Sequence, residues 1–153
     1  TMKQERFVAD LLHYHKLVAD LNTADWRWGH TQGVHSRQCW TADLTSDELW
    51  QQMWQTISAP GYELEHITAY RLNHNQTQTR LESQTVPRRT WQWHPQIQWN
   101  AHWHGATIID GDRVEYEPNL LIAYDSWLPQ THEAPITPDI IRTTVEFTAW
   151  RVI

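Results

Sequence analysis

Apolar residues near the N-terminus recur every three or four positions along the chain. Within residues 3–21 this spacing places their side chains on one face of an α-helix. The residues of the stripe are Phe7, Val8, Leu11, Tyr14, Leu17, Val18 and Leu21. The pattern predicts an amphipathic helix over residues 3–21, with His13 on its polar face.

A second helix is predicted to begin near Thr45. Thr45 and Glu48 have the spacing of a capping box, in which each side chain bonds a backbone N–H at the start of the helix. An apolar stripe follows, made of Leu49, Trp50, Met53, Trp54 and Ile57. The sequence Ser-Ala-Pro-Gly at 58–61 is predicted to end this helix, because proline and glycine are poor helix formers.

The rest of the chain is predicted to form strands. They cover residues 34–42, 62–72, 76–86, 90–109, 113–127 and 140–152. The alternation within 62–72 assigns one face to Tyr62, Leu64, His66, Tyr70 and Leu72. Three prolines within residues 128–138 predict a loop. Short turns between successive strands favour an antiparallel meander.

The segment WQWHPQIQWNAHWHG, residues 91–105, alternates between apolar and polar residues. A strand with this pattern has one apolar face and one polar face. The dipeptide Asp110-Gly111 is typical of a two-residue hairpin turn, which would pair Ile109 with Asp112. We expect the apolar face of this hairpin to pack against the two helices. Its polar face would meet water or a second subunit.

The size and charge of the chain narrow the classes of protein to consider. A chain of 153 residues is expected to form a single domain, residues 1–153. The formal charge of −6 and the presence of only two lysines, Lys3 and Lys16, disfavour binding to nucleic acid or to an anionic membrane. No stretch is apolar enough to span a membrane, and the N-terminus lacks the apolar region of a signal peptide. We expect a cytoplasmic protein.

The sharpest candidate for a metal site lies on the polar face of the predicted hairpin. His102 and His104 are two residues apart, and the hairpin register places Glu117 opposite His104. Two imidazoles and a carboxylate can hold Zn²⁺ or Fe²⁺. A solvated polar face or a His–Glu ion pair is the alternative. The cupin metal motif also begins with His-x-His, but it needs a nearby glutamate, and Gly105–Ile108 supplies none.

His66 is a second candidate, because it stands on a predicted strand face that is otherwise apolar or aromatic. A histidine in this position is either a hydrogen-bonded core residue or a pocket residue whose carboxylate partner tunes it for acid–base work. Asp125 is a possible partner. The glycines form no phosphate-binding loop, which disfavours a nucleotide-dependent mechanism.

The aromatic content bears on the fold. Eleven tryptophans and five tyrosines are too many for a dry core, because indole N–H groups need partners. The order of elements resembles the cystatin/NTF2-like cone, in which a curved antiparallel sheet wraps a helix and encloses a pocket. We therefore expect an α+β fold with a curved antiparallel sheet of about six strands and two packed helices. A half-open, lipocalin-like barrel is the competing architecture.

These expectations lead to several functions. The first is a small-molecule-binding domain for an apolar or aromatic ligand, with a cavity walled by Trp50, Trp54, Tyr62, His66, Tyr70, Trp99, Trp103, Tyr116 and Tyr124. The second is a lyase, isomerase or cyclase that uses His66 and Asp125. Neither of these requires a cofactor. The third is a metal-binding protein that holds Zn or Fe at His102, His104 and Glu117. The last is an interaction protein that forms a homodimer through a sheet face.

Overall fold

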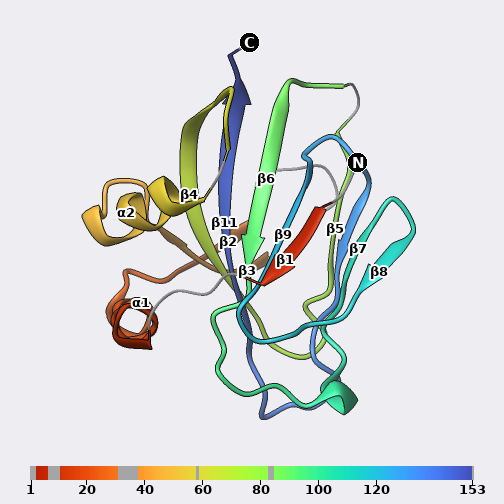
Figure 1. Cartoon of the computed structure of the whole chain (residues 1–153). Coiled ribbons are helices and arrows are strands. Elements are labelled where there is room, and N and C mark those ends of the chain that lie inside the picture. Colours follow the sequence, from red (N-terminus) through yellow and green to blue (C-terminus); the bar gives the residue numbers. More distant parts are fainter. Residues whose placement is uncertain (1–2, 7–10, 31–37, 58, 83–84, 153) are drawn as a thin grey trace.

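Two antiparallel sheets face each other, and two helices cover the outer side of the larger sheet (Figure 1). The computed structural model describes residues 3–6, 11–30, 38–57, 59–82 and 85–152. The large sheet has, in spatial order, β1 (Lys3–Arg6), β9 (Leu120–Asp125), β6 (Arg88–Trp93), β11 (Arg142–Arg151), β4 (Tyr62–Leu72), β3 (Gln38–Asp43) and β2 (Arg27–His30). The small sheet has β5 (Gln78–Arg80), β10 (Gln130–His132), β7 (Thr107–Ile109) and β8 (Asp112–Val114).

From β4 onward the chain crosses between the two sheets at every connection except the β7–β8 hairpin. β4, β6, β9 and β11 lie in the large sheet, whereas β5, β7, β8 and β10 lie in the small one. The α+β class and the antiparallel pairing are confirmed, but the cone and the simple meander are wrong. A short connection shows only that two strands are close in space. The second strand can lie in the same sheet or in the facing sheet, and both are within reach of a short connection. Residues 128–138, expected to be a loop, contain β10 for this reason.

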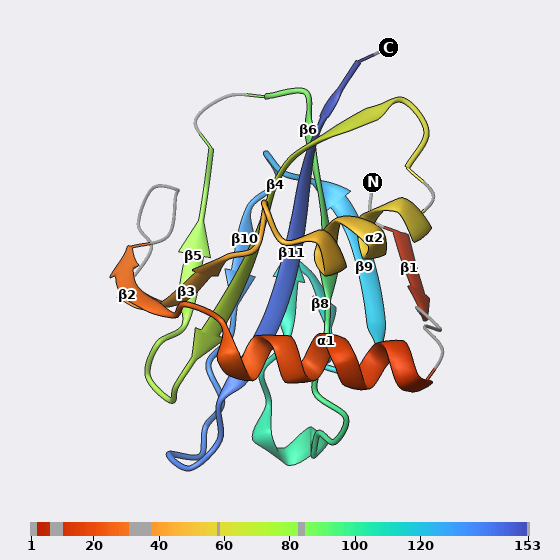
Figure 2. The ribbon, with the colours of Figure 1, turned by 90° about the vertical axis from the view of Figure 1, so that its left-hand side faces the viewer.

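Both predicted helices are present and lie across the strands of the large sheet (Figure 2). Helix α1 spans Leu11–Thr23 and buries Tyr14, Leu17 and Leu21. It begins later than predicted, because Lys3–Arg6 pairs with β9 as strand β1. The stripe residues Phe7 and Val8 lie outside the described residues. None of the helices in the described part of the chain is long and apolar enough to cross a membrane.

Helix α2 spans Glu48–Thr56, and Asp47 caps it in place of Thr45. The Asp47 carboxylate accepts a hydrogen bond from the backbone N–H of Leu49 at 2.9 Å. The Thr45 hydroxyl is already engaged, because it donates to Asp43 at 2.6 Å and accepts from the backbone N–H of Ile67 at 3.0 Å. Thr45 therefore ties the chain before α2 to strand β4.

The core between the helices and the large sheet is aromatic. Trp50 from α2 and Trp93 from β6 are fully buried, and their ring centroids lie 6.0 Å apart. Each indole N–H has a partner: Trp50 donates to Asp20 at 2.6 Å and Trp93 donates to Asn119 at 3.0 Å. Much of the tryptophan content is thus packed core, and polar side chains at its edge satisfy the indoles.

A β-bulge divides strand β4 into two parts with opposite orientation. Thr148 of β11 pairs with His66 and the next residue, Ala149, pairs with Leu64, so that Glu65 is the extra residue. An extra residue shifts the alternation of faces by one position. Leu64 therefore packs against the helix-side core, whereas His66 and Tyr70 line a pocket on the other side. The single face predicted for residues 62–72 is corrected accordingly.

The predicted strand over 90–109 is two strands with a loop between them. Strand β6 ends at Trp93, residues Ala101–Trp103 form one turn of 3₁₀ helix, and β7 begins at Thr107. Pro95 has no N–H to donate to a sheet ladder, and Gly105 has a positive φ of 83°. The Asp110-Gly111 hairpin is confirmed, since Ile109 pairs with Asp112, but its register does not continue to residue 104.

Candidate functional site

A polar pocket of about 260 Å³ opens between the two sheets. It lies on the side of the large sheet that faces away from the helices. Its walls come from β4, β5, β6, β10, β11 and the connections beside them, and they consist of His66, Tyr70, Arg80, Leu81, Glu82, Arg88, Thr90, Ser126, Gln130, Glu146 and Thr148. We call this the inter-sheet pocket. Its lining is mostly hydrogen-bonding and charged.

A buried ion pair crosses from one sheet to the other inside this pocket. Nη1 of Arg80, on β5, lies 2.8 Å and 3.1 Å from the two carboxylate oxygens of Glu146, on β11. The Arg80 guanidinium also stacks over the ring of Tyr70, 4.5 Å from its centroid. Burial alone lowers the pKa of Arg80, but the Glu146 carboxylate outweighs burial and raises it above its ordinary value. Arg80 therefore remains a cation.

The bulge in β4 places Glu65 next to His66, which lines the pocket. Nδ1 of His66 lies 3.0 Å from a carboxylate oxygen of Glu65, and Nε of Arg88 lies 3.1 Å from the other one. Asp125, the expected partner of His66, forms an ion pair with Arg89 at 3.0 Å. The structure thus gives His66 a carboxylate neighbour, but it is Glu65.

Behind the pocket, polar side chains form a continuous network that we call the polar seam. The Tyr124 hydroxyl lies 3.3 Å from Oε1 of both Gln92 and Gln130. His132 Nε2 contacts the same Gln130 oxygen at 3.0 Å. On the other side, the Gln92 amide donates to Thr107 Oγ1 at 2.7 Å. Tyr124, expected in an aromatic wall, is therefore a hydrogen-bonding centre of the interior.

A second buried cation closes the far end of the polar seam. Nη2 of Arg142 donates to Thr107 Oγ1 at 2.6 Å, and its Nε donates to the carbonyl of Gly105 at 2.8 Å. Burial lowers the pKa of Arg142 to about 10. Gly105 has no room for a side chain, because a Cβ there would lie 2.7 Å from the ring of Trp99.

Two histidines in this interior are buried and neutral. Burial, followed by the charge of Arg142, lowers the pKa of His94 to about 3. Both of its nitrogens are engaged, Nδ1 with the Glu117 carbonyl at 3.0 Å and Nε2 with the Gln92 amide at 3.1 Å. Burial, with the charges of Arg80 and Arg142, also lowers the pKa of His132.

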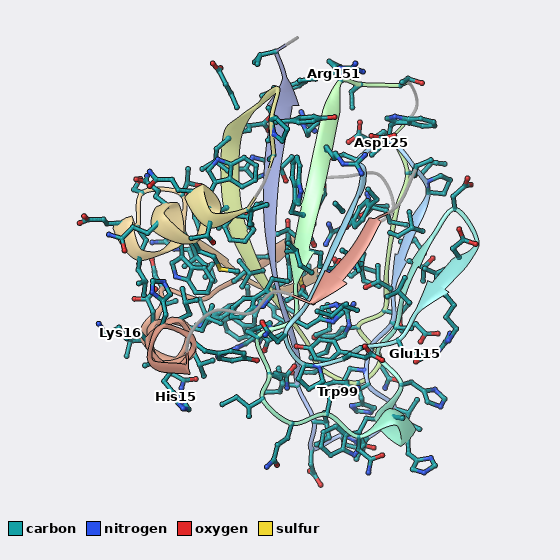
Figure 3. All side chains as sticks on the ribbon, viewed as in Figure 1. His15, Lys16, Trp99, Glu115, Asp125 and Arg151 are labelled. Carbon is teal, nitrogen blue, oxygen red and sulfur yellow. The ribbon has the colours of Figure 1, made fainter. Side chains whose placement is uncertain are left out.

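The cavity walls expected from the sequence are not brought together. Trp50, Trp54 and Tyr62 belong to the helix-side core. Three others gather around the 95–104 loop, where Trp99 contacts Trp103 and Tyr116 at centroid distances of 5.3 Å and 4.3 Å. Figure 3 shows Trp99 and Asp125 toward opposite ends of the sheets. Among the expected walls, His66 and Tyr70 line the inter-sheet pocket.

The expected metal triad is not assembled either. His102 belongs to the 3₁₀ turn and His104 follows it with a positive φ of 62°, whereas the prediction placed both on one strand, with Glu117 opposite His104. Within the described ranges, no group of three His, Cys, Asp or Glu residues could hold a metal ion. The polar strand face proposed as a dimer surface is also absent, because Gln92 and His94 are buried inside the sandwich. Homodimerisation itself stays a prediction.

Several residues of the site were missed from the sequence. Arg80, Glu146, His132 and Arg142 are all buried or nearly so. One signal was available: Glu146 is a lone carboxylate in the otherwise uncharged segment from Thr143 to Trp150, and a charge in a central strand needs a buried partner. The partner, Arg80, lies 66 residues earlier and could not be identified from spacing.

Comparisons with known proteins identify the fold. Neither the protein-family models nor the curated proteins gave a match. Among solved structures, a Pseudomonas putida prolyl-4-hydroxylase superposes with a TM-score of 0.72 at 13% identity, covering 99% of this chain and 92% of that one. The non-heme alpha ketoglutarate dependent carbocyclase SnoK from nogalamycin biosynthesis has a TM-score of 0.72 at 8% identity, covering 98% and 79%.

A third similar structure contains a metal. Iron-bound HygX from Streptomyces hygroscopicus has a TM-score of 0.66 at 6% identity, covering 99% of this chain and 82% of that one. The same protein has been solved with nickel, 2-oxoglutarate and hygromycin B. At these identities the likeness shows the fold alone. The two-sheet arrangement is the jelly roll of these oxygenases, and it replaces the cone and the half-open barrel expected from the sequence.

The comparisons correct the expectation that no cofactor is involved. Proteins with this fold include one that is alpha ketoglutarate dependent and one solved with bound iron. They favour the metal-binding alternative over an aromatic cavity.

The buried residues of this chain do not fit such a metal, however. A non-heme iron site needs two histidines and a carboxylate, but both nitrogens of His94 are engaged and Arg80 holds the Glu146 carboxylate.

The depressed pKa of His94 predicts a pH-dependent stability. Below the unfolded-state pKa of about 6.5, the unfolded chain takes up a proton that folded His94, with a pKa of about 3, does not bind. The stability contributed by neutral His94 is therefore complete above about pH 6.5 and is lost as the pH falls toward 3. By about pH 5 this loss is about 2 kcal/mol.

Urea unfolding at about pH 7.5 and pH 5 measures this loss. In His94→Gln, the decrease between the two pH values should be smaller than in the wild type by about 2 kcal/mol. His15→Gln is the matched control, because His15 is exposed on α1 (Figure 3). An equal decrease in wild type and His94→Gln would contradict the assignment.

Proposed function

We propose that this protein binds a small, uncharged, polar molecule in the inter-sheet pocket. The observation that carries the proposal is the lining itself, in which hydroxyl and amide groups from both sheets converge on one opening. Ligand sites are concave and use a few well-placed polar groups to orient the ligand. Solved proteins of this fold support a small-molecule site in general, since HygX has been solved with 2-oxoglutarate and hygromycin B bound. The uncharged class of ligand is inferred from the lining of this chain's own pocket.

The pairing of charges inside the pocket favours a neutral ligand. Arg80 is paired with Glu146, and Arg88 lies between Glu65 and Glu82, at 3.1 Å and 3.5 Å. An ionised ligand would lose its hydration there without gaining an uncompensated opposite charge. A neutral ligand rich in hydroxyl groups can bond the hydroxyls of the wall, each of which both donates and accepts.

The pocket also changes the ligand class expected from the sequence. Most of the aromatic side chains expected to hold an apolar ligand pack against each other instead. The polar groups that line the opening are Thr90, Ser126, Gln130 and Thr148, together with the charged pairs. The Gln130 amide already belongs to the polar seam, and the hydroxyls of Thr90 and Ser126 lie 2.8 Å from each other. A polar ligand is therefore the better match to the surface that the pocket presents.

Myo-inositol, a compact neutral polyol, is the first probe. Its addition should shift the NMR amide signals of Thr90, Ser126 and Thr148. Thr148→Val removes one hydroxyl from the pocket with little change in shape, and it should weaken binding by about tenfold, which corresponds to one hydrogen bond of about 1.4 kcal/mol. Thr79→Val is the matched control, because Thr79 is exposed on the outer face of β5.

Two results would contradict the proposal. One is binding of myo-inositol that Thr148→Val and Thr79→Val affect equally. The other is a response of the pocket signals to 2-oxoglutarate, which is a dianion, and not to the neutral polyol.

A second candidate function is acid–base catalysis by His66. The observation in its favour is the 3.0 Å contact between His66 Nδ1 and Glu65 in the wall of the pocket. If Nδ1 donates to the carboxylate, the other nitrogen, Nε2, carries the lone pair that can accept a proton. Bulges are frequent next to active sites, where they redirect side chains.

Dihydroxyacetone tests this second candidate, because it is small, neutral and has acidic C–H bonds beside its carbonyl. In D₂O, the protein should accelerate loss of the C–H proton signal, and His66→Gln should reduce that acceleration by about 10²-fold or more. Glu65→Gln should reduce it less, because it only removes the orienting partner. His15→Gln is the control, and an unchanged rate in His66→Gln would exclude the role.

A further inference from the structure

One imidazole nitrogen in the interior is left without a partner. His132 is 1% exposed, and its Nε2 contacts Oε1 of Gln130 at 3.0 Å. Because Oε1 is an acceptor, Nε2 carries the proton and Nδ1 carries a lone pair. Among the described residues Nδ1 has no hydrogen-bond partner. An unprotonated imidazole nitrogen of this kind is a common ligand of transition metals.

Two residues of the neighbouring strand β5 lie beside His132, on the same face of the small sheet. On the neighbouring strand, Gln78 pairs directly with His132 and Arg80 pairs with Gln130. Residues two apart on a strand point to the same side, and Gln78 is buried like His132. A non-heme iron site requires two histidines and a carboxylate on one side of the metal. Here an amide and a guanidinium occupy the two positions beside the single histidine.

The charges around His132 oppose a metal ion as well. A guanidinium has no lone pair to offer and stays protonated. Glu146 cannot act as a substitute ligand, because both of its oxygens are bonded to Nη1 of Arg80. The side-chain amide of Gln78 contacts the thiol of Cys39, on β3. Each group beside His132 is thus either cationic or already engaged.

We infer that the Arg80 guanidinium, held by Glu146, takes the place of a divalent metal ion beside His132, on the face of β5 and β10 that looks toward the large sheet. The position keeps a fixed positive charge and N–H donors, and Arg80 Nε is still without a partner among the described residues. It does not keep the open coordination position that a metal provides. The inference concerns this one position and stands independently of the ligand proposed above.

Cobalt titration of the tag-free protein tests the inference, because Co²⁺ bound to histidine and carboxylate has visible absorption. The wild type should show no saturable binding that depends on His132. The triple variant Gln78→His, Arg80→Asp, Glu146→Gln has two histidines, counting His132, and one carboxylate at the three positions. The change at Glu146 removes the carboxylate that would otherwise lose its Arg80 partner. It should bind one equivalent of Co²⁺ at least about a hundredfold more tightly than the wild type.

Two controls accompany the titration. His132→Ala in the triple background should abolish the gained binding. The variant Gln78→Asn, Arg80→Lys changes the same two strand positions without adding a ligand, and it should bind no better than the wild type. Exposed histidines such as His102 and His104 contribute equally to every sample, so differences between samples report on the interior.

Either of two results overturns the inference. The first is saturable binding of one Co²⁺ by the wild type that His132→Ala removes. The second is a triple variant with wild-type circular dichroism and dispersed NMR signals that binds no Co²⁺, which would show that these three positions do not surround a metal site. If the triple variant does not fold, the wild-type titration decides the question alone.

Discussion

The buried ion pair between Arg80 and Glu146 is the constraint on which the rest of the interior depends. It joins β5 of the small sheet to β11 of the large sheet. Two charges removed from water are costly unless they meet with good geometry, so the two sheets must approach at this point. The same contact positions the Arg80 guanidinium over Tyr70 and defines one wall of the inter-sheet pocket.

One face of the large sheet packs against the helices, and the opposite face carries the polar groups of the pocket. Along β11, Val145 and Phe147 enter the helix-side core, whereas Glu146 and Thr148 line the pocket. The aromatic core against the helices supplies hydrophobic stabilisation, and the opposite face can therefore carry polar groups. Most of those groups satisfy one another through the polar seam, from His132 to Arg142. The proposed ligand site and the proposed replacement of a metal both belong to this second face.

Local patterns predicted local structure well. The stripe of α1, the bounds of β4 and the Asp110-Gly111 hairpin follow from spacing and turn chemistry. The pairing of strands that lie far apart in the sequence does not follow from such patterns, because alternation within a strand carries no information on its partner. The bulge at Glu65 was equally hidden, and it decided which side His66 faces. The segment 91–104 failed as a strand at Pro95, which argues for giving single prolines more weight than extended alternation.

A double-mutant cycle on Arg80→Met and Glu146→Leu tests the central interaction most directly. Each single variant leaves an unpaired buried charge and should lower the free energy of unfolding by about 3–5 kcal/mol, whereas the double variant should lose much less than either. Free energies of unfolding that add to within about 0.5 kcal/mol would contradict the account, because the two side chains would then not depend on each other.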